Sequence, residues 1–124
     1  MGFTFSSHSV EVEIEGEQYV IDLGDAEMLD KVEDWGRKLQ AVDYNSLSEN
    51  RTQLLSSDVQ GYLTALLGKE QFSKAFKNRR FNFIDGLELF AYLWSEVARA
   101  RVAEDFRGRL AKYMPEIDWE SVGE

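Results

Sequence analysis

The sequence predicts an α+β protein that is mostly α, with an N-terminal β-hairpin followed by about four helices, the last of them the longest. Three observations support this prediction. Apolar and acidic residues alternate over residues 10–15, which is the period of a half-buried strand. From about residue 26 onward, apolar residues recur every three or four positions, as in a helix with one buried face. A chain of 124 residues is the size of one domain.

We interpret residues 1–124 as a single domain with four parts. Residues 1–9 form a Ser-rich N-terminus that we expect to be flexible. The hairpin occupies residues 10–23, and the helical body occupies residues 25–114. Residues 115–124 form a tail that begins with the only proline of the chain.

The hairpin is predicted to turn at Gly16-Glu17, because glycine suits the first central position of a type II′ turn. The resulting register places Glu11 opposite Asp22, a like-charge pair that costs a few tenths to about 1 kcal/mol. The acidic face is interpreted either as solvated or as neutralised by cations from another chain or another part of this one. A two-stranded sheet is marginal in water, so it must pack on helices or on a second copy. This register gathers the apolar side chains on one face: Val10, Val12, Ile14, Tyr19, Ile21 and Leu23.

The first helix is predicted over roughly residues 26–43, with Asp25 as its N-cap. Gly36 is the weak residue within it, and it either is merely tolerated or admits a close neighbour. The buried stripe recurs at spacings of four and three residues: Met28, Val32, Trp35, Leu39 and Val42. On the exposed side, three acidic residues each precede a basic residue by four positions, and such pairs stabilise a helix: Glu27–Lys31, Glu33–Arg37 and Asp34–Lys38.

Two further helices are expected over residues 52–67 and 69–77, separated by a glycine. The last helix begins after Asn82, which can cap it, and extends toward Tyr113. Over residues 87–98 the apolar arc is broader than a helix packed on one side needs. Two interpretations stay open: a central position among other elements, or a surface that binds another helix or subunit.

Charge is unevenly distributed along the chain. Residues 1–50 contain twelve acidic and three basic residues, whereas residues 51–124 contain eleven of each. An acidic front half argues against nucleic acid as a partner, because neutralising phosphates requires a basic surface. The sharpest basic run contains Lys77, Arg79 and Arg80. It is interpreted as a solvated helix end, or as a contact for the acidic surface of a neighbouring copy.

We expect no catalytic residue, no cofactor and no metal site. With one histidine and no cysteine, nucleophilic Ser/His and Cys/His sites and thiolate metal sites lack their essential groups. The chain contains neither a P-loop nor a GxGxxG motif. It has no apolar run of the roughly 18 residues that a membrane span needs, and no secretory signal at its start. These features predict a non-enzymatic cytoplasmic protein without a membrane partner.

Three stretches then suggest a family: EIEGEQYVIDLGDAEMLDKVEDW, LLGKEQFSKAFKNRR and FNFIDGLELFAYL. Over about residues 10–113 the chain resembles the small tail assembly chaperones of tailed bacteriophages and prophages of Gram-positive bacteria. In that family an I-x-G-x-x-Y-x-I-D hairpin leads into D-A-E and an amphipathic helix. The same order is found in this sequence.

The resemblance implies a protein that coats the helical tape-measure protein, recruits tail-tube protein and self-associates in the cytoplasm of the bacterial host. It implies a protein-interaction surface on the hairpin and the last helix: Val12, Ile14, Tyr19, Ile21, Phe90, Leu93, Trp94 and Val97. The residues themselves suggest how copies would associate. A free hairpin edge would pair with a neighbour, and front-half acids would face the basic run, Lys77 to Arg80, of the next copy.

Two other classes of protein stay open on the sequence alone. One is a structural head–tail completion protein that remains in the finished phage particle. The other is a small regulatory module that binds one folded partner.

Overall fold

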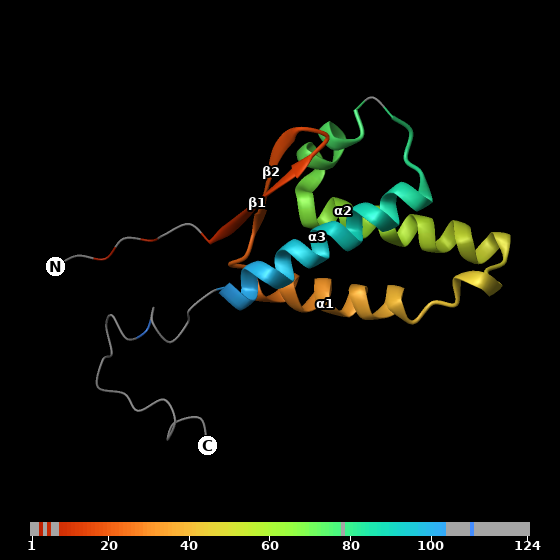
Figure 1. Ribbon diagram of the computed structural model, residues 1–124, viewed down its shortest axis with the longest axis horizontal. Helices are drawn as coiled ribbons and strands as arrows, with labels where there is room; N and C mark the ends of the chain where they lie inside the picture. The colour runs from red at the N-terminus through yellow and green to blue at the C-terminus, as the bar shows by residue number, and fades with distance from the viewer. Residues whose placement is uncertain (1–2, 4, 6–7, 78, 104–109, 111–124) are drawn as a thin grey trace, which may run out of the picture.

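The computed structural model describes residues 3, 5, 8–77, 79–103 and 110 of the chain (Figure 1). The predicted class is confirmed, because a two-stranded antiparallel hairpin precedes a mostly helical body. Residues 115–124 and most of the N-terminus lie outside the described residues. The elements are β1 (Ser9–Ile14), β2 (Glu17–Asp22), α1 (Ala26–Gln40), the 3-10 helix η1 (Tyr44–Ser46), α2 (Glu49–Ala75) and α3 (Phe83–Ala103).

The turn of the hairpin lies one residue earlier than predicted. Glu15 and Gly16 occupy its two central positions, with φ of 52° and 80°. Two positive φ values define a type I′ turn, so the predicted type II′ turn is wrong. This turn matches the twist of the strands, and glycine at its second position adopts positive φ without strain.

The register of the hairpin therefore differs from the predicted one by two residues. Val12 lies opposite Tyr19, and Glu11 lies opposite Val20 rather than opposite an acid. The predicted like-charge pair is thus absent from the hairpin. A shift of two residues keeps every side chain on its face, so the apolar face is the one expected.

Helix α1 begins where the sequence predicts and ends earlier. The Asp25 carboxylate accepts a hydrogen bond from the backbone N–H of Met28 at 3.1 Å, which confirms the N-cap. The helix ends at Gln40, and Asp43 then caps a separate 3-10 turn, accepting from the N–H of Asn45 at 3.1 Å. The three predicted ion pairs are formed: Glu27–Lys31 (3.3 Å), Asp34–Lys38 (3.1 Å) and Glu33–Arg37.

Helix α2 replaces two of the predicted helices with one kinked element. Gly68, with φ of 81° and ψ of 157°, is not helical, so α2 consists of two helical segments that meet at a kink where the sequence predicts a break. The described fold therefore has three α-helices rather than about four. Counted as one kinked element, α2 (27 residues) is longer than α3 (21 residues), but each of its two helical segments, 49–67 and 69–75, is shorter than α3. The predicted extension toward Tyr113 lies outside them, apart from a single residue.

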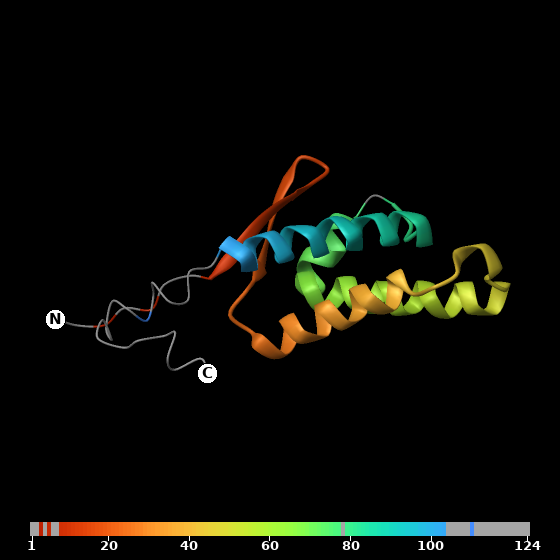
Figure 2. The same cartoon turned by 60° about the horizontal axis from the view of Figure 1, so that its bottom comes forward.

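The hairpin obtains its support from the helices of its own subunit. Its apolar face packs on α2 and α3. Helices α1 and α3 contact each other but diverge along their lengths, and α2 contacts both (Figures 1 and 2). Helix α3 contacts β1, α1 and α2, so its broad apolar arc is explained in part by a central position. The core consists of Val12, Tyr19, Ile21, Val32, Leu39, Val59, Leu63, Leu66, Leu67, Phe90, Leu93 and Val97.

Candidate functional site

Most of the apolar residues predicted to bind a partner lie in the core of the subunit. Six are at most 2% exposed: Val12, Tyr19, Ile21, Phe90, Leu93 and Val97. The other two, Ile14 and Trp94, are half-buried and pack against this core. A fully buried side chain has no surface to offer, so only Ile14 and Trp94 of this set can contact a partner in this conformation.

The two edges of the hairpin are engaged by polar side chains of the helices. At the β2 edge, the Gln71 side-chain amide accepts a hydrogen bond from the N–H of Val20 at 2.9 Å. It also donates a hydrogen bond to the backbone carbonyl of Val20 at 2.8 Å. The amide thus imitates the backbone of a third strand. At the β1 edge, the Tyr92 hydroxyl accepts from the N–H of Glu13 at 3.2 Å. Such contacts reduce the tendency of an edge strand to pair with another chain.

One acid–base contact between α2 and the hairpin is formed within the subunit, by a lysine that lies outside the predicted basic run. The Lys74 ammonium lies 3.2 Å from the Glu17 carboxylate and 5.3 Å from the ring centroid of Tyr19. Both charged side chains are about half exposed, so solvent screens the pair. Part of the acidic hairpin is therefore neutralised by another part of this chain.

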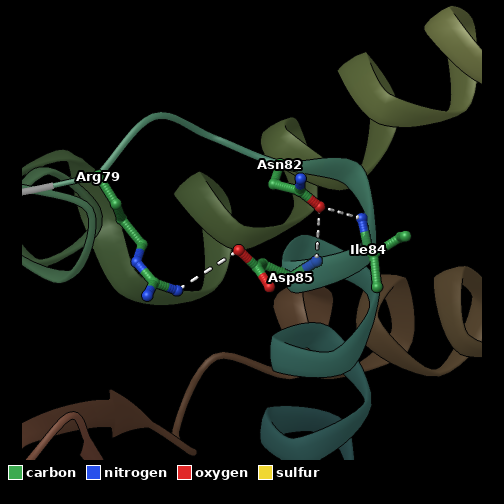
Figure 3. Close-up of polar contacts among 4 residues, drawn as sticks. All are labelled: Arg79, Asn82, Ile84 and Asp85. Atoms are coloured by element: carbon green, nitrogen blue, oxygen red, sulfur yellow. Dashed lines mark hydrogen bonds and ion pairs between the residues drawn. The ribbon is translucent and has the colours of Figure 1, made fainter.

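The predicted basic run lies beside the tip of the hairpin. Arg79 pairs with Asp85 at 3.4 Å, and Asp85 lies in the first turn of α3 (Figure 3). The Asn82 side chain caps that helix, accepting from the N–H of Ile84 at 2.8 Å and of Asp85 at 3.2 Å (Figure 3). Lys77 and Arg79 line a polar hollow of about 400 Å³ that the turn of the hairpin also borders. Arg80 is exposed.

A surface that sequence reasoning did not single out lies between α1 and α3. It consists of two adjoining hollows, which together we call the α1–α3 groove. The first, of about 410 Å³, is lined by Gly36, Leu39, Gln40, Tyr44, Leu87, Glu88, Phe90, Ala91 and Trp94. The second, of about 470 Å³, is lined by Leu29, Val32, Glu33, Trp94, Val97, Ala98 and Arg101. Apolar side chains predominate in both, so the groove suits an apolar partner.

Trp94 lies between the two hollows and borders both of them. Its indole rests against Gly36 of α1, where a Cβ would lie 2.8 Å from the ring carbon Cδ1 and closer still to Nε1. Glycine is therefore required here for close approach, which decides between the two interpretations of that residue. The sequence identified Gly36 as a possible point of close approach, but it did not reveal that Trp94 is the residue that lies there.

The first hollow is bounded at the end of α1 by a tyrosine that stays uncharged. The Tyr44 hydroxyl donates a hydrogen bond to the carbonyl of Leu39 at 2.6 Å, which fixes the 3-10 turn against the helix. Partial burial raises the pKa of Tyr44 above its ordinary value of 10.0, at which the phenol is already neutral at physiological pH. This end of the groove therefore adds no charge.

Comparison of the chain with known protein families, curated proteins and solved structures finds no match. Within the described residues, no helix combines the length and the apolar character needed to cross a membrane. That same part of the chain brings together no group of three or more His, Asp or Glu side chains suited to a metal ion.

Proposed function

We propose that the protein is a non-enzymatic assembly chaperone that binds an amphipathic helix of its client in the α1–α3 groove. The open and apolar character of the two hollows in this groove is the observation that supports the proposal. The apolar hollows beside the contact between α1 and α3 offer a surface on which a third helix can lay its apolar face. Since α2 covers the other side of the α1–α3 pair, a bound helix would complete a four-helix arrangement.

The resemblance to tail assembly chaperones supplies the client in this proposal. The client is the long helical tape-measure protein, whose apolar stripes the chaperone covers in the bacterial cytoplasm until tail-tube protein assembles around it. The excess of acidic residues, with a formal net charge of −9, would keep the loaded complex soluble. Self-association belongs to the same proposal, because many copies must bind along one long client.

Co-expression of the full chain with a tape-measure protein tests this function. Ala91→Arg places a charged side chain in the first hollow, and Ala65→Arg makes the same change at an exposed position of α2 outside the groove. We expect the client to remain soluble and to co-purify with the parent chain and with the Ala65→Arg variant. We expect both effects to be lost with Ala91→Arg. A client kept soluble equally by both variants would contradict the proposal.

Mass spectrometry of purified phage particles separates a chaperone from a head–tail completion protein. A chaperone leaves the tail when assembly ends, so its peptides are expected to be absent from the particles. Stoichiometric recovery of these peptides would favour the structural alternative.

A further inference from the structure

We propose that the outer edge of β1 is a strand-addition site for an extended segment of a partner protein that carries lysine or arginine at alternate positions. This surface is distinct from the α1–α3 groove. The inference therefore goes beyond the proposed function, and it does not depend on what the groove binds.

The backbone of β1 directs polar groups outward along its free edge. Opposite residues of an antiparallel pair alternate between bonding to each other and pointing their N–H and C=O groups away from each other. The two-residue turn makes Ile14 and Glu17 a bonded pair. By this alternation, Glu11 and Glu13 point their N–H and C=O groups away from β2. Val20, which lies opposite Glu11, likewise points both groups outward, to Gln71.

The two edges of the hairpin are closed to different extents. At the β2 edge, the Gln71 side chain satisfies both outward groups of Val20. At the β1 edge, the Tyr92 hydroxyl accepts from the N–H of Glu13. No residue that the structure describes bonds to the outward N–H or C=O of Glu11, or to the C=O of Glu13. An extended segment can therefore add to β1, whereas at β2 it would have to displace Gln71.

The side chains beside this edge favour a basic segment. Glu11 and Glu13 are exposed, and residues 1–30 contain no lysine or arginine. Neither glutamate forms an ion pair with a residue that the structure describes, whereas Glu17 pairs with Lys74. Side chains two positions apart in an added strand lie on one face, beside the two glutamates. Lysine or arginine there forms opposite-charge pairs across the strands.

The same charges argue against β1 of a second copy as the added strand. Two β1 strands that overlap fully over residues 9–13 would place a glutamate beside a glutamate. Like charges in facing positions destabilise a sheet. The partner is therefore a different segment, with an alternating basic pattern that β1 lacks.

The β1 edge and the groove lie on different sides of α3. Tyr92 contacts the β1 edge, and Trp94 borders both hollows of the groove. Two positions along a helix are about 200° apart around its axis. An extended segment at β1 and a helix in the groove therefore do not compete for the same surface.

Extended peptides test the site against the full chain at low ionic strength. The matched peptide has about eight residues and alternates lysine with valine or threonine. Two derivatives of the same sequence carry methyl groups on the backbone nitrogens, one at the lysines and the other at the residues between them. A fourth peptide replaces lysine by glutamate. The fluorescence anisotropy of a labelled peptide measures binding.

Backbone pairing predicts that one of the two methylated peptides binds at least about tenfold more weakly than the matched peptide, because one alternate set of N–H groups faces β1. Which derivative loses affinity reports the direction of the added strand. The glutamate peptide should also bind about tenfold more weakly, because two attractive charge pairs become repulsive. If both methylated peptides bind as tightly as the matched one, strand addition is wrong.

A charge-reversed variant tests the two glutamates. Glu11→Lys/Glu13→Lys should bind the glutamate peptide more tightly than the lysine peptide, which reverses the order found with the parent chain. Asp30→Lys/Asp58→Lys makes the same change in net charge at exposed positions of α1 and α2 and should keep the parent order. Circular dichroism establishes that both variants are folded. If the first is not, the methylated peptides still test the site on the parent chain.

The remaining outcomes separate this inference from the proposed function. A reversed order with the Asp30→Lys/Asp58→Lys control would show that net charge selects the peptide, which would overturn the assignment to β1. Ala91→Arg obstructs the groove and should leave binding of the matched peptide unchanged. A loss of binding with that variant would place the peptide in the groove and overturn the inference. Failure of every extended peptide to bind would overturn it as well, and would leave helix binding in the groove intact.

Discussion

The hairpin and the α1–α3 groove both present apolar side chains, but only the hairpin is covered by the rest of the chain. Tyr19 and Ile21 are 2% exposed, and the side chains of Gln71 and Tyr92 engage the hairpin edges. A two-stranded sheet cannot persist alone in water, so it must be buried for the chain to fold. The groove has no such cover among the described residues. Apolar surface that folding does not need to bury is a mark of a binding site.

The largest expected effect is on the covered side of this comparison. Ile21→Ala removes a side chain that is 2% exposed, and it should lower the free energy of unfolding by about 2–5 kcal/mol. Val20→Ala changes the neighbouring residue, which is 47% exposed, and should cost less than about 1 kcal/mol. Urea denaturation of both variants measures the two values. Equal losses of unfolding free energy would show that burial of the hairpin's apolar face does not stabilise the fold.

Two identical substitutions at different glycines are expected to have opposite signs. Gly36→Ala drives a methyl group into the Trp94 indole and should destabilise the fold by about 1–3 kcal/mol. Gly61→Ala, in α2, meets nothing within 4 Å and should stabilise it by about 0.4–1 kcal/mol, because alanine favours helix and restricts the unfolded chain. Thermal unfolding compares the two. A stabilised Gly36→Ala variant would mean that Trp94 does not occupy its position in the groove.

A smaller effect is expected where the β2 edge is engaged. Gln71→Ala removes both hydrogen bonds to Val20 and should cost about 1 kcal/mol, since water can reach the exposed strand in their place. Gln60→Ala, at an exposed position of the same helix, controls for helix propensity. Light scattering should also show more self-association for Gln71→Ala, because the edge is freed. A variant that self-associates no more than its control would argue that edge pairing plays no part in assembly.

The smallest effect is expected at the ion pair beside the hairpin tip. Lys74→Gln should cost less than about 1 kcal/mol, and the loss should shrink in high salt, because both partners are half exposed. Lys69→Gln, at an exposed position five residues earlier on α2, is the control. Chemical denaturation in urea at two salt concentrations measures both. A loss that is large and independent of salt would show a role in packing rather than in charge.

Local patterns predicted most of the fold correctly. The period-2 alternation identified the hairpin and its buried face, and short-range polar rules identified the caps Asp25 and Asn82. The register was missed because moving the turn by one residue shifts the strand pairing by two residues, which leaves the same side chains on the buried face. Gly68 signals a break in α2, but the sequence does not distinguish a kink from an end.

The site was harder to predict than the fold, because apolar periodicity does not reveal what an apolar residue contacts. Leu93 and Trp94 are adjacent in α3, yet Leu93 is 0% exposed in the core and Trp94 borders the open groove. The close approach of Trp94 to Gly36 joins segments far apart in the chain, and no local pattern encodes it. The same limit applies to Gln71 and Val20, whose pairing closes the β2 edge.

The most direct measurement is the ¹⁵N–¹H correlation spectrum of the full chain as a helical peptide with one apolar face is added. Binding in the groove predicts that the largest shifts occur at the Trp94 indole N–H and at the amides of Gly36, Ala91 and Ala98. The amides of Glu11 and Val20, on the outer face of the hairpin, should not move. Shifts concentrated at Glu11 and Val20, with Trp94 and Gly36 unmoved, would instead assign binding to the hairpin and contradict a groove-binding chaperone.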